Sequence, residues 1–166
     1  EAGVRPEDER LDGWWGYGSD KRLRVLLHTG TTFIAQARLE HTLPRHVDAV
    51  GIRWPAVKIV MAHLAHPYEA ECIAVIRKHA NIYADISALH YRPFQFYHSL
   101  MLVQEYGVWN KLLFGSDYPF TSVRATIDGL RSLNRMVEGT NFPKLDSDQV
   151  ASLIHRDSFE LLGIEA

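Results

Sequence analysis

The stretch Lys111-Leu112-Leu113-Phe114-Gly115-Ser116-Asp117-Tyr118-Pro119-Phe120 decides the fold of this chain. Its apolar start, residues 112–114, follows a basic residue and ends at Gly115, which is typical of a buried strand of a parallel sheet that runs into a loop. Pro119 prevents the strand from continuing. We therefore expect Asp117 just beyond the carboxyl end of a strand, where parallel α/β sheets place ligand-binding carboxylates. The same spacing equally allows Asp117 to be an Asx-turn residue before Pro119.

Composition limits the classes of protein to which the chain can belong. Its 166 residues are 46% hydrophobic and 23% charged, which allows one globular core and excludes a disordered or fibrous chain. The net charge of -2 and the scattered Lys and Arg residues offer no basic face to nucleic acid or anionic lipid. No signal peptide is visible, and no apolar run approaches the roughly 20 residues of a membrane span. With a single cysteine, Cys72, we expect a cytoplasmic protein without nucleic-acid or membrane partners.

Three further apolar runs have the character of buried strands. Together with the first stretch, they predict strands over residues 23–27, 57–61, 82–86 and 112–114. His28 and His63 follow the first two strands as Asp117 follows the fourth. Helical spacing of apolar residues separates the strands, and this alternation predicts four parallel βα units with right-handed crossovers and a terminal helix.

The helices are predicted from apolar periodicity and from residues that begin or end helices. Pro67 precedes one helix, Pro93 begins another, Gly107 closes that one, and Asp146 caps the last. The expected helical segments are residues 47–52, those after Pro67, 93–107, 123–137 and 147–162. Residues 1–22 show neither helical nor strand periodicity, so we assign an irregular N-terminal segment there and one domain over residues 23–166.

Four motifs follow one another with strand-like spacing, and their order resembles a known family. They are Leu27-His28-Thr29-Gly30, Lys58-Ile59-Val60-Met61-Ala62-His63-Leu64-Ala65-His66-Pro67, Asn81-Ile82-Tyr83-Ala84-Asp85-Ile86-Ser87 and Leu113-Phe114-Gly115-Ser116-Asp117-Tyr118-Pro119. Over about residues 23–165 the chain resembles the amidohydrolase-related proteins, the metal-dependent hydrolases and decarboxylases akin to aminocarboxymuconate semialdehyde decarboxylase. The resemblance implies an α/β fold, the C-terminal half of a (β/α)8 TIM barrel with four parallel βα units plus a terminal helix. A whole barrel has roughly 250 residues.

The resemblance also implies a metal site. In that family a divalent metal, usually zinc, is held by a His-x-His or Glu-x-His pair on the first strand, a histidine on the fifth and an aspartate on the eighth. By position, His28 is similar to the fifth-strand ligand and Asp117 to the eighth-strand ligand. His63 matches the sixth-strand histidine that orients or deprotonates metal-bound water or substrate. The resemblance thus makes His63 and Asp117 catalytic, and His28 and Asp117 metal ligands.

The first-strand pair has no counterpart upstream of His28. Because two of the four implied ligands are missing, we expect incomplete zinc binding and a fragment that is inactive alone. Two functions remain open. One is a metal-dependent hydrolase or nonoxidative decarboxylase of a small carboxylated or cyclic substrate. The alternative is a non-catalytic remnant or interaction module, and in either case exposed sheet edges favour a homo-oligomer.

Four other residues have a functional and a structural interpretation. Arg92 lies in an aromatic-rich loop, where it either binds a substrate carboxylate or packs under the aromatic rings. Asp85 either faces the site or bonds at its strand end, and we interpret His66 as a helix-start residue rather than a ligand. Cys72 falls on the apolar stripe of a helix, which indicates a buried structural thiol.

Overall fold

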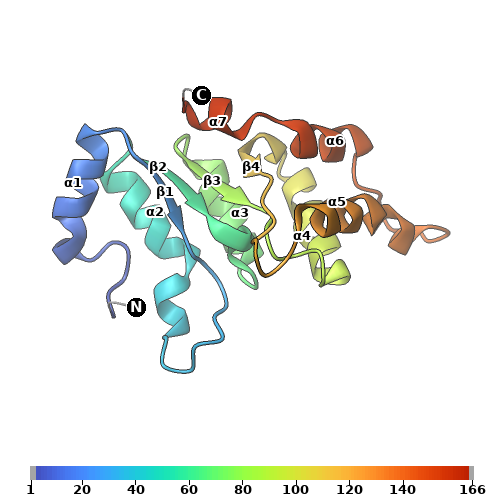
Figure 1. Ribbon diagram of the computed structural model, residues 1–166, viewed down its shortest axis with the longest axis horizontal. Coiled ribbons are helices and arrows are strands. Elements are labelled where there is room, and N and C mark those ends of the chain that lie inside the picture. The colour runs from blue at the N-terminus through green and yellow to red at the C-terminus, as the bar shows by residue number, and fades with distance from the viewer. Residues whose placement is uncertain (1–2, 165–166) are drawn as a thin grey trace. The chain divides into compact units, whose positions relative to one another are not determined.

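The computed structural model describes residues 3–164 as an α/β fold in which strands and helices alternate (Figure 1). The strand order is β1-β2-β3-β4, so neighbours in the chain are neighbours in the sheet, as predicted. Each strand differs from its predicted bounds by one residue at one end. The strands are β1 Arg24–Leu27, β2 Lys58–Met61, β3 Ile82–Asp85 and β4 Leu112–Leu113.

The chain forms two compact units, one up to Ala84 and one from Asp85, and their boundary falls inside β3. In the first unit β1, β2 and β3 pair in parallel, with Leu27 opposite Met61 and Met61 opposite Ala84. Every residue of β3 is buried, whereas Leu26 of β1 is 66% exposed. The strand β1 is therefore an exposed edge of this sheet.

Two helices of the first unit, α2 (Pro44–Arg53) and α3 (Glu69–Lys78), pack on one another. Helix α2 begins at Pro44, before the predicted segment 47–52, because the fixed φ of proline suits the first position of a helix. The apolar stripe of α3 is buried and includes Cys72, which confirms the interpretation of Cys72 as a structural thiol. The 3-10 helices η2 (Leu39–Thr42) and η3 (Ala62–Ala65) precede α2 and α3.

The assignment of residues 1–22 as irregular is wrong for part of that segment. A 3-10 helix, η1 (Glu9–Leu11), leads into the α-helix α1 (Asp12–Asp20). Its glycines hide the periodicity, because Gly16 lies against the Trp54 ring and Gly18 against Val57 where side chains would otherwise show an apolar stripe. Helix propensity alone argued against this helix, and packing overrides it.

The second unit contains β4, α4 (Pro93–Glu105) and the elements that follow β4. The amide of Ile86, just after β3, donates to the carbonyl of Leu113 in β4 at 3.2 Å. Gly107 has φ +65° beyond the end of α4, which fulfils its predicted role. The remaining helical elements are η4 Trp109–Lys111, α5 Val123–Ser132, η5 Leu133–Val137, α6 Ser147–His155 and α7 Ser158–Leu162.

Two of the predicted helices are divided. The segment 123–137 changes from α-helix to 3-10 helix at Leu133, and the last helix is broken between α6 and α7. Arg156 is extended at the break, and its guanidinium donates to the carbonyls of Trp109 and Leu112 at 2.8 and 2.9 Å. Asp157 then caps α7. Within residues 3–164, no helix is long and apolar enough to cross a membrane.

Candidate metal and catalytic site

The first unit brings His28 and His63 together. Their ring centroids are 5.3 Å apart, and the rings meet edge to face at 66°. The contact follows from the sheet, because Leu27 and Met61 are paired at the carboxyl ends of β1 and β2 and each histidine follows within two residues. His28 is exposed and His63 is half-buried, so the pair opens to solvent.

A backbone carbonyl fixes the orientation of the His28 ring. Its Nε2 lies 3.0 Å from the carbonyl oxygen of Thr31, and because a carbonyl can only accept, Nε2 carries the proton. Nδ1 then keeps its lone pair, and no described residue donates a hydrogen bond to it. Metal-bound histidines show this arrangement, one ring nitrogen donating to a carbonyl and the other ligating. Nδ1 of His28 is therefore able to bind a divalent metal.

His63 stands on an unusual stretch of backbone. His63, Leu64 and Ala65 have φ of +62°, +47° and +54°, three consecutive non-glycine residues in the left-handed region. Leu64 and Ala65 are fully buried below the half-buried histidine. Such conformations persist where surrounding structure fixes them, and they concentrate at functional sites.

Asp117 belongs to the second unit, in the turn after β4, with φ +68°. Its backbone carbonyl accepts hydrogen bonds from the amides of Phe120 and Thr121 at 2.9 and 3.3 Å. Its carboxylate accepts none from any residue in 3–164, so the Asx-turn interpretation does not describe this turn. The carboxylate is half-exposed at the strand end, where the sequence predicted a ligand. Convergence of Asp117 with His28 and His63 stays a prediction.

Asp85 and Arg92 also lie in the second unit. The Oδ1 of Asp85 accepts from the Ser87 amide at 2.9 Å and from the Ser87 hydroxyl at 2.5 Å, so Asp85 bonds at its strand end. Arg92 donates to the carbonyl of Ala88 at 3.1 Å, and its guanidinium lies 4.5 Å from the centroid of the Tyr91 ring. No carboxylate within residues 3–164 pairs with Arg92, so its charge is available to an acidic ligand. Its role in substrate binding stays a prediction.

His66 is the C-cap of η3 and lies before α3 rather than at its start, since Tyr68 is the N-cap of α3. It is 7% exposed, and its Nδ1 lies 2.6 Å from Oε1 of Glu69, the first residue of α3. Across the described part of the chain, no three His, Cys, Asp or Glu side chains are grouped so that they could hold a metal ion.

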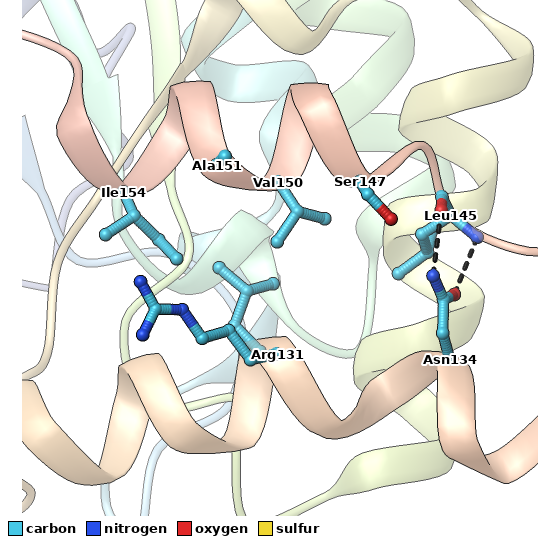
Figure 2. Close-up of a pocket in the computed structure, with 8 residues that line it drawn as sticks. Arg131, Asn134, Leu145, Ser147, Val150, Ala151 and Ile154 are labelled. Atoms are coloured by element: carbon cyan, nitrogen blue, oxygen red, sulfur yellow. Dashed lines mark hydrogen bonds between the residues drawn. The ribbon is translucent and has the colours of Figure 1, made fainter.

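A cavity in the second unit is lined by residues other than the predicted site residues. It has a volume of about 160 Å³ between α5 and α6 (Figure 2). Asn134 closes one end by bonding the backbone of Leu145 in both directions, at 2.8 and 2.9 Å, while Arg131 and Ile154 lie at the other. A volume below the roughly 300 Å³ of ordinary ligand pockets, and no acid, base or nucleophile beyond Arg131 and Ser147, make it a packing defect rather than a catalytic site.

The contacts of the segment Thr29-Gly30-Thr31 were not predicted from the sequence. Thr29 is 2% exposed and donates to the carbonyl of Ala62 at 2.8 Å. The amide of Thr31 donates to the carbonyl of His66 at 2.7 Å. The sequence places these residues after a strand but gives no sign of their partners, which are more than 30 residues away.

Comparison with known proteins agrees with this fold. The family model described as Amidohydrolase matches residues 3–156. An uncharacterised TIM-barrel protein from Bordetella bronchiseptica is 22% identical, with a TM-score of 0.71 over 96% of this chain and 52% of that one. A zinc-bound amidohydrolase from Burkholderia multivorans is 15% identical, with a TM-score of 0.67 over 99% of this chain and 62% of that one.

A third solved structure is a dihydroxybenzoic acid decarboxylase from a Polaromonas species, with bound manganese and the inhibitor 2-nitroresorcinol. It is 14% identical, with a TM-score of 0.60 over 96% of this chain and 55% of that one. No curated protein matches the chain. The chain thus spans about half the length of the solved structures that it matches, and it has the fold of half a TIM barrel.

Proposed function

Because the chain belongs to the amidohydrolase family, we propose that it supplies part of the active site of a metal-dependent hydrolase or nonoxidative decarboxylase. The substrate is a small carboxylated or cyclic molecule. A zinc-bound amidohydrolase and a manganese-bound decarboxylase of the same fold support both the metal and the pair of reactions. The choice between the two reactions rests on the substrate, because one site architecture can host both.

One observation carries the proposal: the edge-to-face contact of His28 and His63 at 5.3 Å, with Nε2 of His28 held by Thr31. A surface histidine without a function would need neither a neighbouring imidazole nor a hydrogen bond that orients its ring. Two imidazoles at adjacent strand ends, one with its tautomer fixed and its other nitrogen available, suit a site that binds a cation and moves a proton.

The residues have different roles in this proposal. His28 and Asp117 are the ligands that this chain contributes, through Nδ1 of the imidazole and the carboxylate. A zinc-like ion at such a site polarises a carbonyl or lowers the pKa of water. His63 accepts a proton from the substrate or from water, or donates one to the substrate, since an imidazole ring nitrogen can either accept or donate a proton. The guanidinium of Arg92 binds the substrate carboxylate, because its charge has no acidic partner among residues 3–164.

The partners and location stay parts of the proposal. The free edge of β1 and the exposed side chain of Leu26 favour association with a second copy of the chain or with a barrel half that completes the sheet. The cytoplasmic location follows only from the single cysteine.

The direct test measures metal-dependent turnover of the protein as its gene encodes it. The protein is assayed with added Zn²⁺ or Mn²⁺ on a panel of aromatic carboxylic acids, lactones and amides, and CO₂ release separates decarboxylation from hydrolysis. We expect His63→Ala and Asp117→Ala each to lower kcat by about 100-fold or more, while His155→Ala leaves it unchanged. Turnover that is independent of metal, or that survives both substitutions, would contradict the proposal, and no turnover at all would favour a non-catalytic remnant.

A further inference from the structure

The turn that presents His63 is bound at both ends by one short segment. The carbonyl of Ala62, just before the left-handed residues, accepts the Thr29 hydroxyl at 2.8 Å. The carbonyl of His66, just after them, accepts the Thr31 amide at 2.7 Å. Thr29 is almost completely buried, so its hydrogen bond is shielded from water. The loop after β1 therefore holds both ends of the turn after β2.

Gly30 lies between these two hydrogen bonds, at φ +88°. A Cβ atom at this position would lie 2.1 Å from the carbonyl oxygen of His66 and 2.7 Å from the carbonyl carbon of Ala65. Both neighbours are backbone atoms, so they cannot yield by rotating a side chain. Only a residue without Cβ allows the two loops to approach this closely.

Gly30 is itself held from the opposite side. Its amide donates to the carbonyl of Thr42 at 3.1 Å, and the Thr42 hydroxyl donates to the carbonyl of Gly30 at 2.6 Å. Both polar backbone groups of Gly30 are thus satisfied. The segment 29–31 is therefore hydrogen-bonded to Thr42 as well as to the His63 turn, and it supports that turn.

The same segment also determines the position of His28. Thr31 makes two hydrogen bonds. Its amide donates to the carbonyl of His66, and its carbonyl accepts a hydrogen bond from Nε2 of His28 at 3.0 Å. One peptide segment therefore contacts the His63 turn and the His28 ring. The two rings lie 5.3 Å apart next to this segment.

We propose that Thr29 and Gly30 are positioning residues that set the His28–His63 pair by clamping residues 62–66. The inference deepens the proposed function, which explains why the geometry of this pair matters. The geometric claim, however, can be tested without metal or substrate. The positioning role of Thr29 and Gly30 can therefore be confirmed or refuted whether or not the protein has the proposed catalytic activity.

The test is an NOE between ring protons of His28 and His63 in the metal-free 166-residue chain, with amide spectra to verify the fold. We expect the wild type to show the cross-peak and Thr29→Val, which keeps the shape but removes the hydroxyl, to lose it. Thr29→Ser, which keeps the hydroxyl, should retain the cross-peak. A purely structural contribution of bulk would give the opposite order.

The variant Gly30→Ala should also lose the cross-peak, while Gly139→Ala should keep it. Gly139 is the matched control because it has φ +74° with no atom within 4 Å of its Cβ position, so it isolates the strain of a positive φ. If Gly30→Ala does not fold, the comparison of Thr29→Val with Thr29→Ser tests the positioning role. A cross-peak that persists in Thr29→Val would overturn the proposal, and so would global unfolding of Thr29→Val together with Thr29→Ser.

Discussion

At the scale of single residues, His63 and Asp117 share an uncommon backbone conformation with Arg22, Leu64, Ala65 and Ala88. Both have positive φ without being glycine, at +62° and +68°, and each follows a strand end. A left-handed conformation costs an L-residue roughly 1–2 kcal/mol. Hydrogen bonds to backbone carbonyls in each turn contribute to offsetting this cost.

A second glycine permits the close packing of α2 on β3. A Cβ on Gly51 would lie 2.6 Å from Cδ1 of Ile82 and 3.1 Å from the His79 ring, and Ile82 is fully buried. We predict that Gly51→Ala lowers the free energy of unfolding by about 1–3 kcal/mol through overpacking. Gly13→Ala in α1 is the control, because nothing lies within 4 Å of it, and it should be neutral or slightly stabilising. Urea unfolding of both variants measures the difference, and equal midpoints would contradict the prediction.

The ion pair between Arg45 of α2 and Glu71 of α3 makes stability depend on pH. Side-chain hydrogen bonds from Arg45, at 2.8 and 2.9 Å, hold the pKa of the Glu71 carboxyl below its ordinary value of 4.5. The unfolded chain then binds more protons, so this stabilisation is complete above about pH 4.5 and is lost as the pH falls through the folded pKa.

We predict that Glu71→Gln flattens the fall in stability below pH 4.5, and only modestly because Arg45 is exposed to solvent. Urea midpoints between pH 3 and 7 measure this slope. Glu138→Gln is the control, since Glu138 is exposed and makes no ion pair within residues 3–164. An unchanged slope in Glu71→Gln would show that the pair does not act on stability.

Candidate site residues could be predicted from the sequence, but the residues that hydrogen-bond to them could not. Position after a strand was enough to select His28 and His63, because a parallel sheet aligns its strand ends. The clamp from Thr29 to Ala62 could not be predicted, since the bond joins residues 33 positions apart and depends on the left-handed turn. Asp117 was selected in the same way and Arg92 from its aromatic-rich loop, and their functional roles stay predictions.

Among the secondary-structure elements, those with a strong apolar periodicity were predicted correctly, whereas a helix that packs through its glycines was missed. All four strands were predicted from apolar runs, whereas α1 was missed because Gly16 and Gly18 form its packing face. The break between α6 and α7 was missed because it depends on the bonds of Arg156 to distant carbonyls. Both misses are cases in which tertiary contacts override local signals.

Helix α6 depends on its predicted cap. The Asp146 carboxylate accepts the amides of Asp148 and Gln149 at 2.8 and 3.1 Å. We predict that Asp146→Ala destabilises α6 by about 1 kcal/mol, while Asp146→Asn, which keeps the acceptor, costs little. Hydrogen exchange of the α6 amides measures the effect locally. Equal exchange rates in both variants would show that the cap contributes nothing.

At the scale of the whole molecule, the edge strand β1 governs association. Leu26 is 66% and Leu23 41% exposed at β1, the terminal strand of the sheet that residues 3–164 form. We predict that the 166-residue chain elutes from a sizing column as a species larger than a monomer. Leu26→Lys should shift it towards the monomer, since a charge on an edge strand opposes pairing. A wild type that elutes as a monomer at all concentrations would contradict this prediction.

We propose His28 and Asp117 as metal ligands, and the amount of zinc that the chain takes up is the closest test of this assignment. The wild-type chain, His28→Ala, Asp117→Ala and the control His155→Ala are dialysed against Zn²⁺, and bound metal is counted per chain. Two ligands hold zinc weakly, so we predict well under one zinc per wild-type chain, unchanged in the control and lost in either ligand variant. Uptake that is the same in all four proteins, or one zinc per chain retained through dialysis without His28 and Asp117, would contradict the claim.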